Sequence, residues 1–225
     1  KTISLDVAGS VWGGGGINGY KTRWRSTVNG LEALAAKHND TLLTLDELAE
    51  VSPRSAAAAA YMLANGCGKQ RAQVDGTAKE AWEWRLCFLS AGEIDLATHL
   101  DSEGQRVRAG QEVRMVNIDA DQAKGLGIFE NLHEFDSPAL LADHLRLQVG
   151  CYHGTAIRAF IQALLELPHP SQRIKDHTAA FTASHDSKNL SGQKHRILKR
   201  FALLYAAGAL AFEFKLIPSS KLEIQ

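Results

Sequence analysis

Apolar positions in the first half of the chain alternate between helical and strand-like spacing. Three segments carry apolar side chains along one helix face: residues 2–11, 31–38 and 54–65. Three others are short and rich in β-forming or apolar types, as strands are: residues 22–28, 41–45 and 86–89. The last two carry no charge, which is typical of strands buried on both faces of a parallel sheet. Strands separated by helices predict an α/β fold.

Turn and capping residues refine these boundaries. Ser52-Pro53 predicts the start of the helix at 54–65, and Gly66 predicts its end. Asp75-Gly76 predicts a β-hairpin within residues 69–84. Residues 94–100 are expected to be helical, and residues 112–118 alternate as a further strand would.

The second half of the chain has helical periodicity throughout. The predicted helices there span residues 138–149, 155–167, 174–184 and 193–214. In the last of them, Phe201, Leu204 and Tyr205 have core spacing, and Gly208 predicts the close approach of a neighbour. We therefore expect an α/β core in residues 1–125 and a helical C-terminal subdomain in residues 126–225.

Charge and cysteine content add little to this picture. Lys and Arg together number 25, as do Asp and Glu, so the formal net charge is zero. The chain therefore lacks the overall positive charge that is typical of many nucleic-acid-binding proteins. Cys67, Cys87 and Cys151 form no CxxC pair, which indicates a reducing compartment and argues against a structural zinc site. The longest strongly apolar stretch, residues 201–212, is shorter than the roughly 20 residues of a membrane-spanning helix. The expected location is the cytoplasm.

Asp46 and Glu47 directly follow the apolar run at 41–45. In P-loop nucleotide hydrolases, one acid after such a strand holds Mg²⁺ and the next polarises the water that attacks the γ-phosphate. This chemistry requires both acids at the carboxyl end of a buried strand, where open α/β sheets bind ligands. The alternative is a solvated strand end without a catalytic role.

Lys1 and Thr2 stand at the head of the first predicted helix. A phosphate-binding loop, GxxxxGK[ST], is followed directly by a helix, so Lys-Thr is what remains of a loop that is cut after its last glycine. Lys1 would contact the β- and γ-phosphates of ATP, and Thr2 would ligate Mg²⁺. One helix, one strand and a further helix separate Thr2 from Asp46, as the additional-strand P-loop architecture requires. We expect the chain to be a fragment of a longer protein.

Three further residues fit this architecture. Ser90 ends the run at 86–89, where a small polar residue senses the γ-phosphate; the alternative is that Ser90 caps the following helix. Arg106 and Arg108 precede the strand expected at 112–118, where ring-forming ATPases present an arginine to the neighbouring subunit's nucleotide. The alternative for both is a solvated loop.

The predicted hairpin carries Lys69, Arg71 and Lys79, as the pore loops of hexameric helicases do, although an ordinary exposed hairpin has the same pattern. The chain also has four tryptophans that either stack on single-stranded nucleic acid or pack in the core: Trp12, Trp24, Trp82 and Trp84.

Several motifs resemble one bacterial domain-of-unknown-function family with a P-loop, found in phage, plasmid and integrated-element proteins and often joined to a Toprim-type primase module. The motifs are Asn29-Gly30-Leu31-Glu32, Leu45-Asp46-Glu47-Leu48, Tyr61-Met62-Leu63-Ala64-Asn65-Gly66, Asp75-Gly76-Thr77-Ala78, Arg108-Ala109-Gly110-Gln111-Glu112-Val113-Arg114 and the late helix around Ala207-Gly208-Ala209-Leu210-Ala211.

The resemblance implies an ATP-driven helicase or translocase that accompanies a primase. It matches Lys1 and Thr2 to the end of the phosphate loop, Asp46 and Glu47 to the acidic strand end, and Ser90 to the sensor. It matches Arg106 and Arg108 to basic positions, without deciding which of the two is the arginine presented to the neighbouring subunit's nucleotide. The strand and glycine loop that precede Lys1 in the family are missing here, so the backbone cradle for the β-phosphate is missing too. We therefore expect weak ATP binding by these 225 residues.

The resulting hypothesis is a RecA- or AAA-like P-loop NTPase core that lacks its first strand, followed by a helical subdomain. It would hydrolyse ATP with Mg²⁺ while moving on nucleic acid, foremost single-stranded DNA, as a homo-oligomeric ring in phage or mobile-element replication. A primase module would lie in the same or a neighbouring chain. The alternatives are a degenerate P-loop scaffold for oligomerisation or nucleic-acid binding, and an ATPase that remodels proteins.

Overall fold

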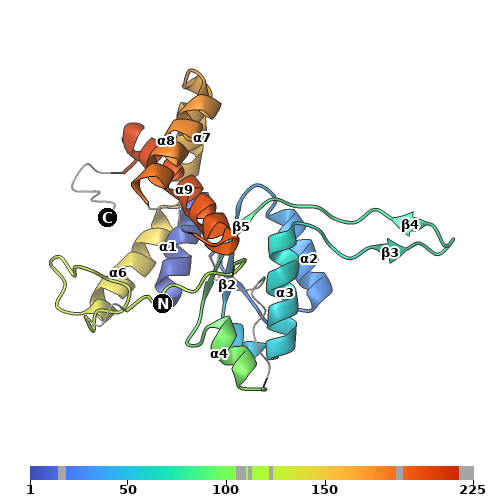
Figure 1. Cartoon of the computed structure of the whole chain (residues 1–225). Helices are drawn as coiled ribbons and strands as arrows, with labels where there is room; N and C mark the ends of the chain where they lie inside the picture. The colour runs from blue at the N-terminus through green and yellow to red at the C-terminus, as the bar shows by residue number, and fades with distance from the viewer. Residues whose placement is uncertain (15–18, 105–109, 111–112, 122–123, 186–189, 218–225) are drawn as a thin grey trace. The chain divides into compact units, whose positions relative to one another are not determined.

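The structure is a computed structural model, which describes residues 1–14, 19–104, 110, 113–121, 124–185 and 190–217 (Figure 1). The chain forms two compact units, Lys1–Gly154 and Thr155–Gln225, and each is described by itself. The predicted division into a P-loop core at residues 1–125 and a helical C-terminal subdomain at residues 126–225 stays a prediction.

A three-stranded parallel sheet forms the centre of the first unit. Its strands are β1 (Thr22–Arg23), β2 (Leu42–Asp46) and β5 (Cys87–Ala91), in the order β1-β2-β5. The middle strand β2 is buried on both faces, and Leu43 and Leu45 are completely inaccessible to solvent. The mixed α/β class and the parallel sheet are therefore confirmed.

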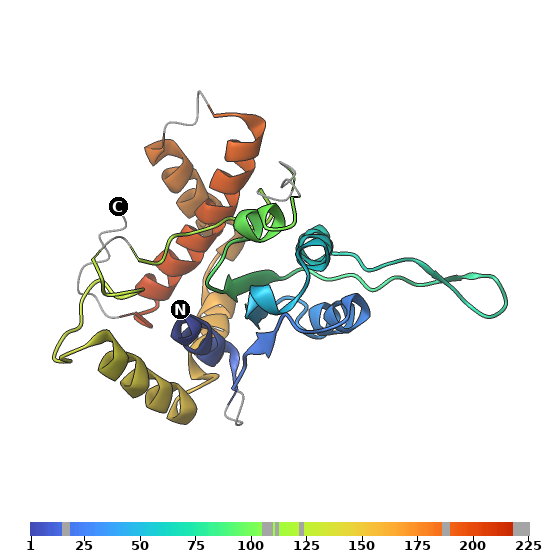
Figure 2. The same cartoon turned by 90° about the horizontal axis from the view of Figure 1, so that it is seen from below.

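Helices cover both faces of this sheet (Figure 2). On one face, α2 (Val28–Lys37), α3 (Pro53–Asn65) and α4 (Leu96–Asp101) contribute to a single apolar core. On the other face, α1 (Thr2–Trp12) packs against β2 and β5, and α6 (Pro138–Cys151) packs against α1. The capping signals of α3 are confirmed, because the Ser52 hydroxyl accepts a hydrogen bond from the Ser55 amide and Gly66 ends the helix at φ 74°.

A long hairpin, which we call the arm (residues 68–83), extends away from the sheet and helices of the first unit (Figure 1). It contains β3 (Arg71–Ala72) and β4 (Ala78–Lys79), which pair antiparallel around the turn at Asp75-Gly76. At its base, the Gly68 amide donates to the Trp82 carbonyl at 2.8 Å. All side chains from residue 69 to residue 80 are exposed. The predicted hairpin is confirmed.

Two sequence expectations for the first unit are wrong in part. The strand expected at 22–28 ends at Arg23, and α2 begins at Val28 because Thr27 caps it by accepting a hydrogen bond from the Gly30 amide. Residues 113–118 form no strand, and residue 112 lies outside the described residues. Val113 is buried and Met115 packs on the core, whereas Val116 and Ile118 are exposed, so the apolar pattern of this segment marks neither a strand nor one continuous buried side.

The second unit consists of α7 (Thr155–Glu166), α8 (Pro170–Ser184) and α9 (Gly192–Glu213). The buried stripe of α9 carries Leu198, Ala202, Ala206 and Leu210. The expected core face is wrong in part, because Leu204 is 56% exposed and a Cβ on Gly208 would meet open space. Phe201 and Tyr205 are half-buried, and the Tyr205 ring packs against Phe181 of α8 with 5.0 Å between ring centroids. Within the described residues, no helix has the length and apolarity to cross a membrane.

At the end of α9, Glu213 joins this helix to α8. The Arg173 guanidinium donates to both carboxylate oxygens, at 3.2 and 2.7 Å, and Nε2 of His177 lies 3.0 Å from Oε1. The hydrogen bonds and the charge of Glu213 raise the pKa of Arg173. This contact fixes the register between the two helices.

Candidate functional site

The carboxyl edge of the parallel sheet brings several of the predicted site residues together. Asp46 is the last residue of β2 and is 6% exposed. One of its carboxylate oxygens lies 3.6 Å from Nζ of Lys21, and the same ammonium lies 3.2 Å from Oδ1 of Asp6 on α1. A buried carboxylate requires such a partner, since an isolated charge is strongly disfavoured away from water.

Glu47 follows in a left-handed backbone conformation, with φ 63° and ψ 63°. Its amide donates to the Ala91 carbonyl at 3.2 Å, and its own carbonyl accepts from the Glu50 amide at 3.1 Å. These bonds turn the chain sharply after Asp46 and leave the Glu47 side chain exposed at the sheet edge. A residue other than glycine in this region is strained, and such strain gathers at functional sites.

The first helix runs antiparallel to β2, so its start lies toward the same edge. Near its middle, a Cβ placed on Gly9 would lie 2.8 Å from Cβ of Tyr20, whose hydroxyl donates to the carbonyl of Leu42 at the beginning of β2. Nearer its start, Asp6 is linked through Lys21 to the end of β2. Glycine at position 9 is thus what permits this close packing.

Lys1 and Thr2 are the N-cap and the first residue of α1. Lys1 is exposed and Thr2 is partly exposed, one turn before Asp6. Within the described part of the chain, no hydrogen bond or ion pair joins either residue to Asp46. The fold therefore orients the start of α1 toward the acidic strand end without a hydrogen bond or ion pair between their side chains.

Ser90 lies in β5 opposite Leu45, and its hydroxyl accepts a hydrogen bond from Nε1 of Trp24 at 2.9 Å. Trp24 is fully buried, and its amide donates to the Asp46 carbonyl at 3.0 Å. The Ser90 side chain is thus fixed one position before the carboxyl end of β5. The alternative that Ser90 caps the next helix is wrong, because Asp95 caps α4.

The predicted arginines Arg106 and Arg108 lie outside the described residues. Arg114 lies within them, with its guanidinium 4.4 Å from the centre of the Tyr61 ring. It also donates to the Asn65 side chain at 3.1 Å and to the Gly110 carbonyl at 2.8 Å. Arg114 therefore fastens this part of the chain to α3.

The tryptophans divide between the two roles considered for them. Trp24 and Trp84 are buried in the core, and Trp84 donates to the Leu63 carbonyl at 3.0 Å. Trp82 is 49% exposed at the base of the arm. Packing therefore accounts for the first two, and only the position of Trp82 suits stacking among these three.

Sequence reasoning missed Asp6, Lys21 and Trp24 as members of this edge. The available signals were weak: Asp6 follows Thr2 by about one helical turn, and Lys21 and Trp24 flank a strand of two residues. Their roles depend on contacts across the sheet, which no local pattern specifies.

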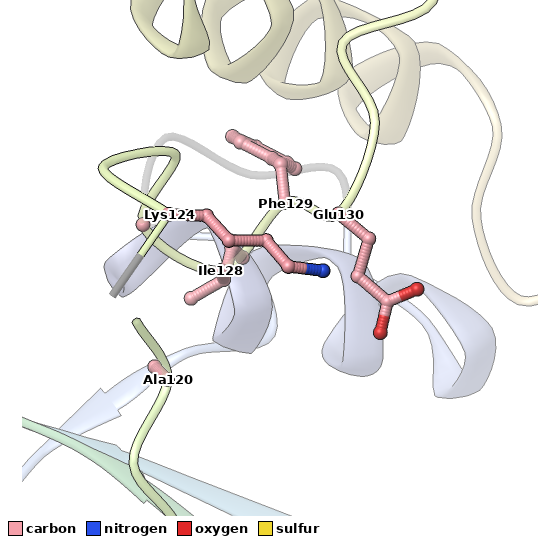
Figure 3. A pocket seen from close by; sticks show the side chains of 6 residues that line it. Ala120, Lys124, Ile128, Phe129 and Glu130 are labelled. Atoms are coloured by element: carbon pink, nitrogen blue, oxygen red, sulfur yellow. The ribbon is translucent and has the colours of Figure 1, made fainter. Parts of the chain in front are cut away.

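A small hollow elsewhere in the first unit contains none of these residues (Figure 3). It is lined by Ala120, Lys124, Gly127, Ile128, Phe129 and Glu130. Figure 3 shows the side chains of Lys124 and Glu130 extending in the same direction from this loop. Among the described residues, no three His, Cys, Asp or Glu side chains are grouped to hold a metal ion.

The first unit is thus a parallel α/β domain with a buried aspartate and an exposed, strained glutamate at the carboxyl edge of its sheet. Residues 1–83 match the model of the domain of unknown function DUF927. A solved structure of SCCmec type IV Cch, named as an active helicase, is similar in fold, with a TM-score of 0.65 at 18% identity. The similarity covers 100% of this chain, which spans 37% of that chain. No curated protein matches this sequence.

Proposed function

We propose that this chain is part of a helicase-type NTPase that hydrolyses ATP with Mg²⁺ and moves on nucleic acid. The observation that carries the proposal is the end of β2, where Asp46 is buried and Glu47 is exposed in a left-handed conformation. Open parallel sheets bind their ligands at this edge. The fold similarity to an active helicase supports the same conclusion.

The residues at this edge fit a nucleotide-bound magnesium ion. Mg²⁺ prefers oxygen ligands and is usually held by one or two protein groups together with phosphates, and Thr2 and Asp46 supply a hydroxyl and a carboxylate. When bound, the ion would neutralise phosphate charge. Glu47 would accept a proton or hydrogen bond from the attacking water, and Lys1 would bind phosphate. Ser90 would sense the γ-phosphate from its fixed position beside Trp24.

The free edge of β5 fits a further strand that carries the glycine-rich phosphate loop. In the described residues, β5 pairs with β2 alone, and Cys87 and Leu89 are exposed along it. An exposed apolar edge is a ready site for strand pairing. We infer that the phosphate-loop strand of the parent protein lies beside β5 and that these 225 residues alone bind ATP weakly.

The arm is the part of the chain that we assign to nucleic-acid contact. It places Lys69 and Lys79 on an extended hairpin and Trp82 at the base. Ammonium groups bind phosphates, and an exposed indole stacks on unpaired bases. A homo-oligomeric ring, with Arg106 or Arg108 acting on the neighbour's nucleotide, and an accompanying primase module complete the proposal.

A second candidate is a scaffold that no longer hydrolyses ATP. One observation favours it: the Lys21 ammonium already partners Asp46, so the fold satisfies this buried charge without a metal ion. In that case the sheet edge would serve structure alone.

The deciding experiment measures ATP hydrolysis by the parent protein with its upstream loop present, with and without single-stranded DNA. Glu47→Gln is the test variant, and Glu50→Gln, an exposed neighbour in the following turn, is the matched control. The proposal predicts DNA-stimulated hydrolysis that is lost in Glu47→Gln and retained in Glu50→Gln. Absence of hydrolysis in the intact protein would favour the scaffold, and hydrolysis indifferent to DNA would favour a protein-remodelling ATPase.

A further inference from the structure

The basic side chains of the arm have unequal surroundings. Nη2 of Arg71 lies 2.8 Å from Oε2 of Glu32 on α2 and donates to the Asn29 side chain at 2.7 Å. Glu32 is 1% exposed, and its other oxygen accepts a hydrogen bond from the Lys69 amide at 3.3 Å. A single buried carboxylate therefore holds both the side chain and the backbone of the first arm strand.

The backbone at the base of the arm is shaped around this carboxylate. A Cβ placed on Gly68 would lie 3.2 Å from Oε2 of Glu32, so a side chain there would crowd the ion pair. The Gly68 amide is hydrogen-bonded to the Trp82 carbonyl on the returning strand. Gly68 thus lies against Glu32 and is hydrogen-bonded to the returning strand, so Glu32 is linked to both strands of the arm.

The strand register gives the ion pair a second consequence. Arg71 is paired directly with Lys79 across the hairpin, and like charges at opposed positions destabilise a strand pair. Glu32 neutralises Arg71 and thereby removes this repulsion. Within the part of the chain that the structure describes, Lys69 and Lys79 have no ion-pair partner.

We propose that Glu32 is a positioning residue that fixes the arm to α2 and that Arg71 is its anchor. The charge available to a polyanionic ligand then comes from Lys69 and Lys79. The assignment of a ligand rests on the proposed function, whereas the anchoring of the arm does not. A buried carboxylate stabilises only when its partner is present, so loss of either partner releases the base of the arm.

The anchor is tested by hydrogen–deuterium exchange of the full chain over residues 67–84. Glu32→Gln and Arg71→Gln should each speed exchange at Gly68 and Lys69 by about tenfold or more, because each leaves the other group without its charge partner. The exposed Glu80→Gln on the same arm is the matched control and should leave exchange unchanged. Unchanged exchange in Glu32→Gln would overturn the proposal.

A double variant separates release of the arm from general unfolding. Glu32→Gln combined with Arg71→Gln removes both charges, so no uncompensated charge remains buried. The double variant should be at least as stable to heat as either single variant while its arm still exchanges faster than in the wild type. Equal protection of the arm in the double variant and the wild type would show that the ion pair does not position it.

The unequal roles of the basic residues are tested by binding of a fluorescein-labelled oligodeoxythymidylate at several salt concentrations. Lys79→Gln should reduce the slope of log affinity against log salt by about 0.7, the value for one phosphate contact on a single strand. Arg71→Gln should weaken binding at every salt concentration with little change in slope. An equal loss of slope in both variants would identify Arg71 as a ligand contact. If the wild type binds no DNA, the proposed function fails, and exchange still decides the anchor.

Discussion

Replacing Glu47 by glycine should stabilise the first unit while removing the proposed catalytic carboxylate. The left-handed conformation of Glu47 costs a residue with a Cβ about 1–2 kcal/mol, and glycine adopts it without strain. Glycine also gives the unfolded chain more freedom, which offsets about 0.4–1 kcal/mol. The net gain is about 0.5–1 kcal/mol, or a rise in Tm of about 1–4 °C for a protein of this size.

Thermal unfolding followed by tryptophan fluorescence measures this effect, because all four tryptophans lie in the first unit. Glu47→Ala is the matched control: it also removes the carboxylate but keeps the Cβ and hence the strain. We expect Glu47→Gly to unfold at a higher temperature than both Glu47→Ala and the wild type. A Glu47→Gly chain that unfolds at or below the temperature of Glu47→Ala would refute the reasoning from backbone strain.

Three other predictions concern the same unit. Leu45→Ala should lower the free energy of unfolding by about 2–5 kcal/mol in denaturant titrations, because it leaves a cavity at a fully buried position; a loss under 1 kcal/mol would contradict this. Ser90→Ala should lower the free energy of unfolding by about 1–3 kcal/mol, because it leaves the buried Trp24 indole N–H without a hydrogen-bond acceptor. Ser90→Thr keeps the hydroxyl and should lower the free energy of unfolding less. Hydrogen bonds from the Thr77 hydroxyl and amide hold the pKa of Asp75 below its usual 3.8. The carboxylate's support of the turn is therefore complete above about pH 4 and is lost as the pH falls through the lowered pKa; an NMR titration of the Thr77 amide with a midpoint at or above 3.8 would contradict it.

Local signals account for the elements that the sequence predicts well. The apolar run before Asp46 identifies β2, and Ser52-Pro53 with Gly66 delimits α3, since each signal acts within a few residues. The hairpin at Asp75-Gly76 is predictable for the same reason: its turn chemistry is contained in two residues.

The features that the sequence did not predict depend on contacts between separate elements. Residues 113–118 alternate in sequence without forming a strand: Val113 is buried, whereas Val116 and Ile118 are exposed. The buried stripe of α9 runs through Ala202 and Ala206 rather than through its largest side chains, because packing decides which face of a helix is buried. Likewise, the bridge of Lys21 between Asp6 and Asp46 joins residues from separate elements. The position of Asp46 was therefore predictable, whereas the groups that surround it were not.

The length of the arm can change without any change in the domain from which it extends. From Gly68 to the turn at Asp75 it extends about 23 Å, at roughly 3.3 Å per residue. Because successive side chains alternate between faces, removal of two residues from each strand shortens it by about 7 Å and keeps every remaining side chain on its own face. The closure at Gly68 and Trp82 stays intact in such a change. Paired deletions or insertions beyond this closure would thus change the length of the arm without a compensating change in the core.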